Sequence, residues 1–261
     1  MATVRLHVRR YGDAPDATPL VLLHGLFGSS ANWHGIARRL AQRRPVLVPD
    51  LRNHGQSPHD PLMAYALMAD DLLALLEREG VERAIVVGHS MGGKAAMCLT
   101  LRHPERVEAV GVVDIAPVVY PSGFETLIDA LIALPLQDVT SRGDADRRLR
   151  AAIPDPSVRG YLLQNLRRDG DAWDWRFNLS SIAAGLPAIR GFPDEGEDEF
   201  AGPALFLYGT GSDYVGADAL AAIRRRFPLA RLRAIANAGH WVYAEQPDAF
   251  VAALEAFIRK L

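Results

Sequence analysis

The sequence has one cysteine, no long hydrophobic run and little net charge. Because Cys98 is the one cysteine among 261 residues, a disulfide within the chain is excluded, which suits a reducing compartment. No uninterrupted apolar run approaches the roughly 18 residues that a membrane-spanning helix needs. The opening residues, MATVRLHVRRYGD, lack the apolar stretch of a secretory signal. These absences predict a cytoplasmic protein that does not enter a membrane.

The near balance of charges argues against a polyanionic partner such as nucleic acid. The chain carries 29 Lys and Arg against 31 Asp and Glu, a formal net charge of −2. Its short arginine runs, such as RRR at 224–226, are typical of solvated helix faces. No pair of histidines has the spacing of a metal site, so we expect no metal. The hydrophobic content of 49% suffices for the core of one large α/β domain, and the oligomeric state is left open.

Short apolar runs alternate with helical patterns along most of the chain. Most of the runs are solid rather than alternating, as in strands covered on both faces, and they lie at 19–25, 45–50, 84–90, 107–117, 203–209 and 230–240. Helical patterns occupy 64–79, 91–103, 217–227 and 247–260. This order predicts an α/β fold with a mostly parallel central sheet flanked by helices.

The alternation stops between about 118 and 200. Four helix-like pieces follow one another there without a convincing strand, near 122–134, 144–153, 157–168 and 179–189. We therefore expect a core formed by 1–117 and 201–261, and a helical lid formed by 118–200.

Apolar side chains of the expected lid have two open roles. They could line an acyl pocket, or they could seat the lid on the core. The aromatic candidates are Trp173, Trp175 and Phe177, and the aliphatic candidates on one helix face are Leu127, Leu131 and Leu134.

Residues 88–92, Gly-His-Ser-Met-Gly, fit the pattern G-x-S-x-G between an apolar strand and a helix. A strand that turns abruptly into a helix places Ser90 in a tight conformation, where side chains at 88 and 92 would collide. Such a turn would present the Ser90 hydroxyl at the carboxyl edge of the sheet. Ser90 is therefore the candidate nucleophile.

A serine hydroxyl needs a base and its reaction needs an oxyanion site. His240 in NAGHW follows the last strand beside a glycine and is the best base. The turn HGLFGSS at 24–30 could offer a free backbone N–H from Leu26, with Phe27 as the alternative. The N–H of Met91 would supply the second donor.

Several of these motifs together carry a family resemblance. The segments HGLFGS, DLRNHGQSP, GHSMGGKAAM, DIAP and AGHWVYAE resemble those of the α/β-hydrolase superfamily, and are most similar to YbfF-type esterases and their eukaryotic abhydrolase relatives. The resemblance spans about residues 4–261. It implies the α/β-hydrolase fold with a helical lid inserted after the sixth strand. It also implies a serine hydrolase of ester or thioester bonds that needs no cofactor.

The third catalytic residue has two candidates. Ser212 stands where many α/β-hydrolases carry the acid, and Asp213 follows it. The resemblance implies that the acid is instead Asp114, with Ser212 assisting through a hydrogen bond. Both loops lie at the carboxyl edge of neighbouring strands, so the residues alone allow either. Asp114 is favoured because it ends an apolar strand, where its charge needs a partner.

The remaining site candidates are expected to bind substrate. Arg52 and Asn53 in RNHG would either contact the substrate or serve only to hold their loop. The other expected contacts are His24, His89, Trp173, Trp175 and Trp241.

The sequence favours hydrolysis of an apolar acyl ester or acyl-thioester through an acyl-enzyme. The same residues could instead hydrolyse a C–C bond of a diketone-type substrate or support a perhydrolase activity. A noncatalytic ligand-binding role on the same fold is a third alternative.

Overall fold

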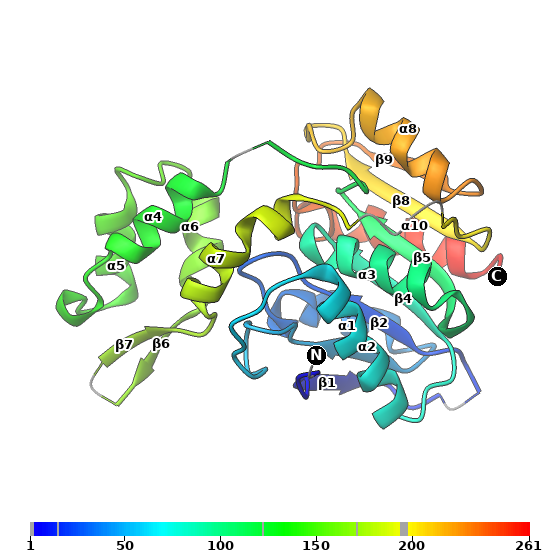
Figure 1. Ribbon diagram of the computed structural model, residues 1–261, viewed down its shortest axis with the longest axis horizontal. Coiled ribbons are helices and arrows are strands. Elements are labelled where there is room, and N and C mark those ends of the chain that lie inside the picture. The colour runs from blue at the N-terminus through cyan, green and yellow to red at the C-terminus, as the bar shows by residue number, and fades with distance from the viewer. Residues whose placement is uncertain (1–2, 15, 122, 171, 194–197) are drawn as a thin grey trace.

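A computed structural model describes residues 3–14, 16–121, 123–170, 172–193 and 198–261. Its centre is a seven-stranded sheet in the order β1-β3-β2-β4-β5-β8-β9 (Figure 1). The strands are β1 (Val8–Tyr11), β2 (Leu20–Leu23), β3 (Val46–Pro49), β4 (Ala84–His89), β5 (Val107–Val113), β8 (Ala204–Gly209) and β9 (Arg231–Ile235). Only β1 runs antiparallel to its neighbour, so the predicted mostly parallel sheet is confirmed.

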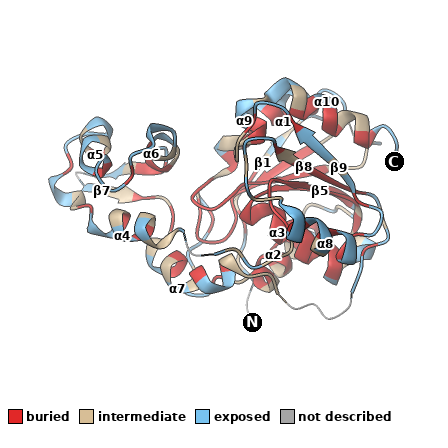
Figure 2. Ribbon diagram, turned by 90° about the horizontal axis from the view of Figure 1, so that it is seen from above, coloured by how far each residue is buried: buried red, intermediate tan, exposed pale blue. Residues whose placement is uncertain are grey.

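Helices cover both faces of the sheet, and successive strand residues belong to two separate cores. On β2, Leu20 and Leu22 pack in one buried cluster, whereas Val21 and Leu23 pack in the other. One face is covered by α1 (His34–Leu40), α9 (Val242–Glu245) and α10 (Pro247–Ile258), and the other by α2 (Tyr65–Arg78), α3 (Met91–Arg102) and α8 (Ala217–Arg226) (Figure 2). Burial on both faces is the reason that the central strands are solid apolar runs.

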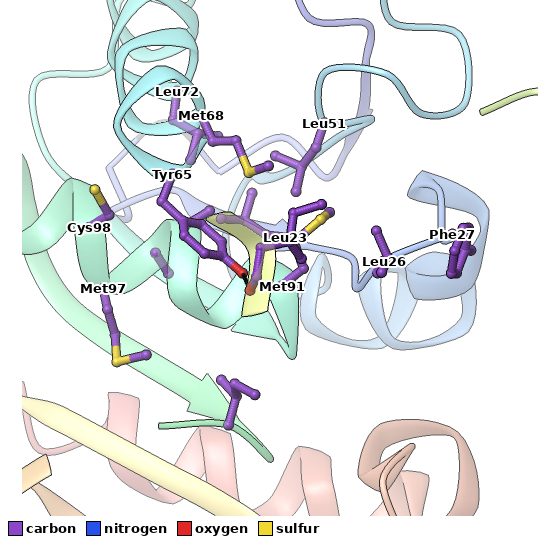
Figure 3. Close-up of a cluster of buried hydrophobic side chains, with 14 of the residues drawn as sticks. Leu23, Leu26, Phe27, Leu51, Tyr65, Met68, Leu72, Met91, Met97 and Cys98 are labelled. Atoms are coloured by element: carbon purple, nitrogen blue, oxygen red, sulfur yellow. Dashed lines mark hydrogen bonds between the residues drawn. The ribbon is translucent and has the colours of Figure 1, made fainter. Parts of the chain in front are cut away.

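Short 3₁₀ turns complete the core at Ser30–Trp33 and Pro104–Arg106. The predicted helices at 64–79, 91–103, 217–227 and 247–260 correspond to α2, α3, α8 and α10. The sequence interpretation did not include β1, α1 or α9, all of which have at most seven residues. Cys98 lies on α3 and is fully buried with Met97, Leu72 and Met68 (Figure 3).

The inserted segment leaves the sheet after β5 and returns before β8. It contains α4 (Glu125–Ala133), a 3₁₀ turn (Leu136–Asp138), α5 (Arg142–Leu149), α6 (Pro156–Leu163), β6 (Leu166–Asp169), β7 (Ala172–Trp175) and α7 (Leu179–Arg190). Figure 1 shows α4, α5, α6 and the β6–β7 pair grouped on the left, with α7 next to the core. Parts of the expected lid, residues 122, 171 and 194–197, lie outside the described residues.

Two expectations about this segment were wrong. Its helices follow the fifth described strand rather than a sixth. Only β1 precedes β2 among the described residues, so β5 is the last strand before the segment. The segment also contains a strand pair, β6–β7, where only helices were expected. Leu166 and Trp175 are buried partners in that pair, but each strand has only four residues, too few for a clear alternating pattern.

A buried lysine joins the start of the inserted segment to the end of α7. The ammonium of Lys94 on α3 donates hydrogen bonds to the carbonyl of Val118, at 2.9 Å, and to those of Arg190 and Gly191, at 2.9 and 2.7 Å. Lys94 is 1% exposed, and its nitrogen lies 4.7 Å from the ring centre of Tyr120. One side chain of the core therefore binds both the start of the inserted segment and the end of α7.

Within the described ranges, no helix has both the length and the apolar character that crossing a bilayer requires.

Candidate active site

Ser90 is a single residue between the end of β4 and the start of α3. Its backbone has φ 52° and ψ −119°, in a region that L-residues other than glycine rarely occupy. Its N–H donates to the carbonyl of Val113 on β5, at 3.0 Å. A strained residue of this kind persists only where its surroundings hold it, and such residues cluster at functional sites.

The glycines beside Ser90 have the predicted steric role. A Cβ on Gly88 would overlap the carbonyl of Gly92, and a Cβ on Gly92 would lie 2.5 Å from the carbonyl oxygen of His24. The sharp turn from strand to helix is possible because neither position carries a side chain.

Asp114 and His240 meet at the same edge of the sheet as Ser90. The Nδ1 atom of His240 lies 2.7 Å from Oδ2 of Asp114, which is fully buried just after β5. The hydroxyl of Ser212 donates to the same oxygen at 2.5 Å, and the N–H of Gly209 donates to Oδ1 at 3.2 Å. Because Nδ1 donates to the carboxylate, Nε2 of a neutral His240 is the acceptor. The other acid candidate, Asp213, is exposed.

Aromatic rings hold the imidazole of His240 in place. The ring of Tyr214 stacks on it with centroids 4.1 Å apart, and the buried His89 lies at 4.6 Å. His89 donates from Nε2 to the carbonyl of His240, at 2.9 Å. Burial, with a smaller contribution from His240, holds the pKa of His89 well below its usual value, so His89 is neutral.

The turn after β2 leaves one backbone donor free of partners. The N–H of Phe27 donates to Nε2 of His54, at 3.1 Å, so it is not available to an oxyanion and the alternative assignment to Phe27 is wrong. Among the described residues, the structure provides no acceptor for the N–H of Leu26. Met91 is the first residue of α3, and N–H groups of a first helical turn have no partner inside the helix.

A cavity of about 450 Å³ opens onto these groups. From the core it is lined by Leu26, Ser90 and His240, and His89 and Trp241 also reach it, as expected for both. The inserted segment contributes Phe124, Leu127, Val158, Tyr161 and Leu162. The cavity is thus mostly apolar, with the serine and histidine at one wall.

Comparisons with known proteins agree with this architecture. The family model described as the alpha/beta hydrolase fold matches residues 18–247. The chain therefore belongs to the α/β-hydrolase family. It is 42% identical over 252 residues to a Danio rerio sn-1-specific diacylglycerol lipase, ABHD11, covering 94% of this chain and 79% of the relative.

Two further likenesses extend over nearly the whole of this α/β-hydrolase. Esterase YbfF of Escherichia coli is 38% identical over 242 residues, which cover 92% of this chain and 93% of that protein. A solved marine microorganism esterase has a TM-score of 0.94 and 35% identity, covering 98% of this chain and all of the other. The resemblance to YbfF-type esterases that the motifs indicated is confirmed.

Three of the expected substrate contacts do not reach the cavity. Arg52 is buried in a two-pronged ion pair with Asp71, at 2.7 and 2.9 Å. Asn53 has φ 65° and accepts from the N–H of Asp60, at 2.8 Å. His24 donates from Nδ1 to the carbonyl of Gly25, at 2.9 Å. For the RNHG residues, the structure thus favours the interpretation that they hold their loop.

The two tryptophans of the inserted segment are not among the described residues that line the cavity, contrary to the prediction. Trp175 stacks on Phe177 with ring centroids 5.1 Å apart, and Phe177 packs edge-on against Phe27 of the core, also at 5.1 Å. Trp173 lies on β7 under the guanidinium of Arg168. These aromatic residues seat the β6–β7 pair instead of forming a pocket.

Sequence reasoning missed several residues that do line the cavity. Tyr120 and Phe124 precede α4. Val158, Tyr161 and Leu162 lie on α6, and Tyr214 stacks on His240. Nothing in their sequence pattern distinguishes them from ordinary apolar helix or loop residues. Their role depends on where the inserted segment lies relative to the sheet.

Proposed function

We propose that this α/β-hydrolase cleaves carboxylic esters through an acyl-enzyme formed on Ser90. The observation that carries the proposal is the convergence of three elements on one cavity. Ser90, on its strained turn, and His240 both line this cavity, and Asp114 holds Nδ1 of His240 at 2.7 Å. The names of the relatives, an esterase and a diacylglycerol lipase, support an ester as the substrate.

The chemistry uses these residues in sequence. Nε2 of His240 takes the proton from the Ser90 hydroxyl as its oxygen attacks the ester carbonyl carbon. Asp114 fixes the tautomer of His240 and stabilises the imidazolium. The imidazolium returns the proton to the leaving alcohol as the acyl-enzyme forms. Water then attacks the acyl group, with His240 as base, and the acid product leaves Ser90.

Ser212 supports Asp114 rather than acting on the substrate. Its hydroxyl donates to the same carboxylate oxygen that accepts the hydrogen bond from Nδ1 of His240. The backbone N–H groups of Leu26 and Met91 stabilise the oxyanion, which is usually the largest single contribution to this class of catalysis.

The cavity favours an apolar acyl group and an uncharged leaving group. Its volume lies within the range of small-molecule sites. None of the described residues that line it is Lys or Arg, and Asp213 is its one carboxylate. A coenzyme A thioester carries phosphates that such a wall would not bind. We therefore expect esters to be better substrates than acyl-CoA thioesters. The segment 118–200 acts as the lid of this cavity.

A substrate profile tests the proposal. The purified protein and a Ser90→Ala variant are compared on p-nitrophenyl esters of graded acyl length, on acyl-CoAs and on a diketone, and both are treated with a fluorophosphonate probe. We expect probe labelling and ester hydrolysis that are lost in Ser90→Ala by at least about a thousandfold. Absence of labelling on the folded protein, or turnover of the diketone alone, would contradict the proposal.

A further inference from the structure

Three consecutive peptide groups form the turn at residues 25–28, and five of their six polar groups are hydrogen-bonded. The peptide between Gly25 and Leu26 has its oxygen held by Nδ1 of His24 and by the N–H of Gly28, both at 2.9 Å. In a trans peptide the N–H points opposite to the C=O. Fixing the oxygen of Gly25 therefore fixes the direction of the Leu26 N–H, the proposed oxyanion donor.

The next two peptide groups are held from two sides. The N–H of Phe27 is bound by His54, which belongs to the core. The carbonyl of Leu26 accepts from the hydroxyl of Tyr161, at 3.0 Å, and the carbonyl of Phe27 accepts from Nδ2 of Asn165, at 2.6 Å. Tyr161 lies on α6 and Asn165 lies two residues after the end of this helix, so both donors come from the inserted segment.

The turn needs this support because its backbone is strained. Phe27 has φ 59°, a conformation that is unfavourable for a non-glycine residue and that persists only where neighbours hold it. Gly28 allows the close approach of the lid, since a Cβ there would lie 2.6 Å from the hydroxyl of Tyr161. Asn165 is 3% exposed and its amide has no contact with the cavity.

We infer that Tyr161 and Asn165 are positioning residues, which fix the turn at residues 25–28 from the side of the lid. They hold the carbonyls of Leu26 and Phe27, so that the N–H of Leu26 stays directed at the reacting carbonyl. The inference rests on the proposed ester hydrolysis. It means that the lid does more than cover the substrate: the cavity roof and the oxyanion donor are assembled by the same helix. Without α6, the turn keeps only the bonds to His24, His54 and Gly28.

The inference is tested with Asn165→Leu and Tyr161→Phe, which remove one donor each at similar volume. Tyr65→Phe is the matched control, because its hydroxyl also joins core to lid, donating to the carbonyl of Ile189 at 2.7 Å, but away from the turn. For each variant, kcat and KM on an ester, the affinity for an alkylboronic acid and the thermal midpoint are measured. The boronic acid forms a tetrahedral adduct with Ser90 and so reports on the oxyanion donors.

We expect kcat to fall by about tenfold to hundredfold in Asn165→Leu and Tyr161→Phe, with KM within about threefold of the wild type. Boronate affinity should fall in parallel with kcat/KM. Tyr65→Phe should keep both while losing some thermal stability. If Asn165→Leu and Tyr161→Phe lose only stability, as the control does, both residues merely seat the lid and the inference is overturned. A wild-type protein that hydrolyses no ester would overturn the proposed function itself.

Discussion

Asp114 and Asp213 both follow strands at the same edge of the sheet, yet their surroundings differ completely. Asp114 is fully buried, and its carboxylate accepts hydrogen bonds from His240, from Ser212 and from the N–H of Gly209. Asp213 is exposed at the mouth of the cavity. A buried carboxylate with three donors is held in one orientation, whereas a solvated one is free to turn.

This contrast gives a prediction about turnover. Asp114→Asn should lower kcat by about a thousandfold to ten-thousandfold, because the amide cannot stabilise the imidazolium and favours the wrong tautomer of His240. Asp213→Asn, the matched control, should stay within about threefold of the wild type. Steady-state kinetics on a p-nitrophenyl ester at pH 7 measure both. A larger loss in Asp213→Asn than in Asp114→Asn would assign the acid to the other loop.

Single residues at strand ends were predictable, whereas the use of backbone groups was not. Ser90, Asp114 and His240 each follow a strand of the parallel sheet, so the topology alone places them at one edge. The choice between the N–H groups of Leu26 and Phe27 depends on His54, which lies 27 residues away from Phe27 in the sequence. No local pattern contains that information.

At the scale of elements, the side chains of α4 have three different surroundings. Leu127 lines the cavity, whereas Leu131 is buried in the core cluster. Ile132 on the same helix is 60% exposed. One helix thus borders the substrate space, packs against its neighbours and faces solvent, as its amphipathic pattern allows.

We predict that α4 limits the length of the acyl group. Leu127→Trp adds volume inside the cavity and should lower kcat/KM for octanoate by about tenfold or more relative to acetate. Ile132→Trp places the same side chain outside the cavity and should leave that ratio unchanged. The ratio is measured with p-nitrophenyl esters. An unchanged ratio in Leu127→Trp would show that the acyl chain extends in another direction.

The elements of the core were easier to predict than those of the lid. All six predicted runs became strands, and for most of them burial on both faces leaves a strong signal. The predicted helix at 157–168 ends at Leu163 instead, and β6 begins three residues later. A four-residue strand that is half exposed gives a weak signal, so the β6–β7 pair and the tryptophans on it were misjudged.

At the scale of the whole molecule, Lys94 links the catalytic core to the start of the lid and to the end of α7. Burial lowers the pKa of its amine to about 7, although three carbonyls and the ring of Tyr120 favour the charged form. An unfolded lysine has a pKa of about 10.4. Between these values the unfolded chain binds more protons than the folded protein, so this residue makes stability rise with pH.

We predict that the free energy of unfolding depends on pH with a different slope in the wild type and in Lys94→Met. From pH 7 to 9.5, the free energy of unfolding of the wild type should rise relative to that of the variant, by at most about 1.4 kcal/mol per pH unit. The nearest titratable rings do not interfere, because burial raises the pKa of both Tyr65 and Tyr120. Urea denaturation at several pH values measures the slopes. Parallel curves would show that Lys94 keeps its usual pKa.

The contacts of Lys94 with both Val118 and Gly191 also bear on how such an enzyme could change. Since these two residues bind one side chain, the helices between them could be replaced by a segment of another length or shape without changing the path of the chain through the sheet. The new segment would have to bring its own pair of donors for the carbonyls of Leu26 and Phe27. Replacing the lid would therefore leave the topology of the sheet intact, but the new segment would need hydrogen-bond donors at two defined positions.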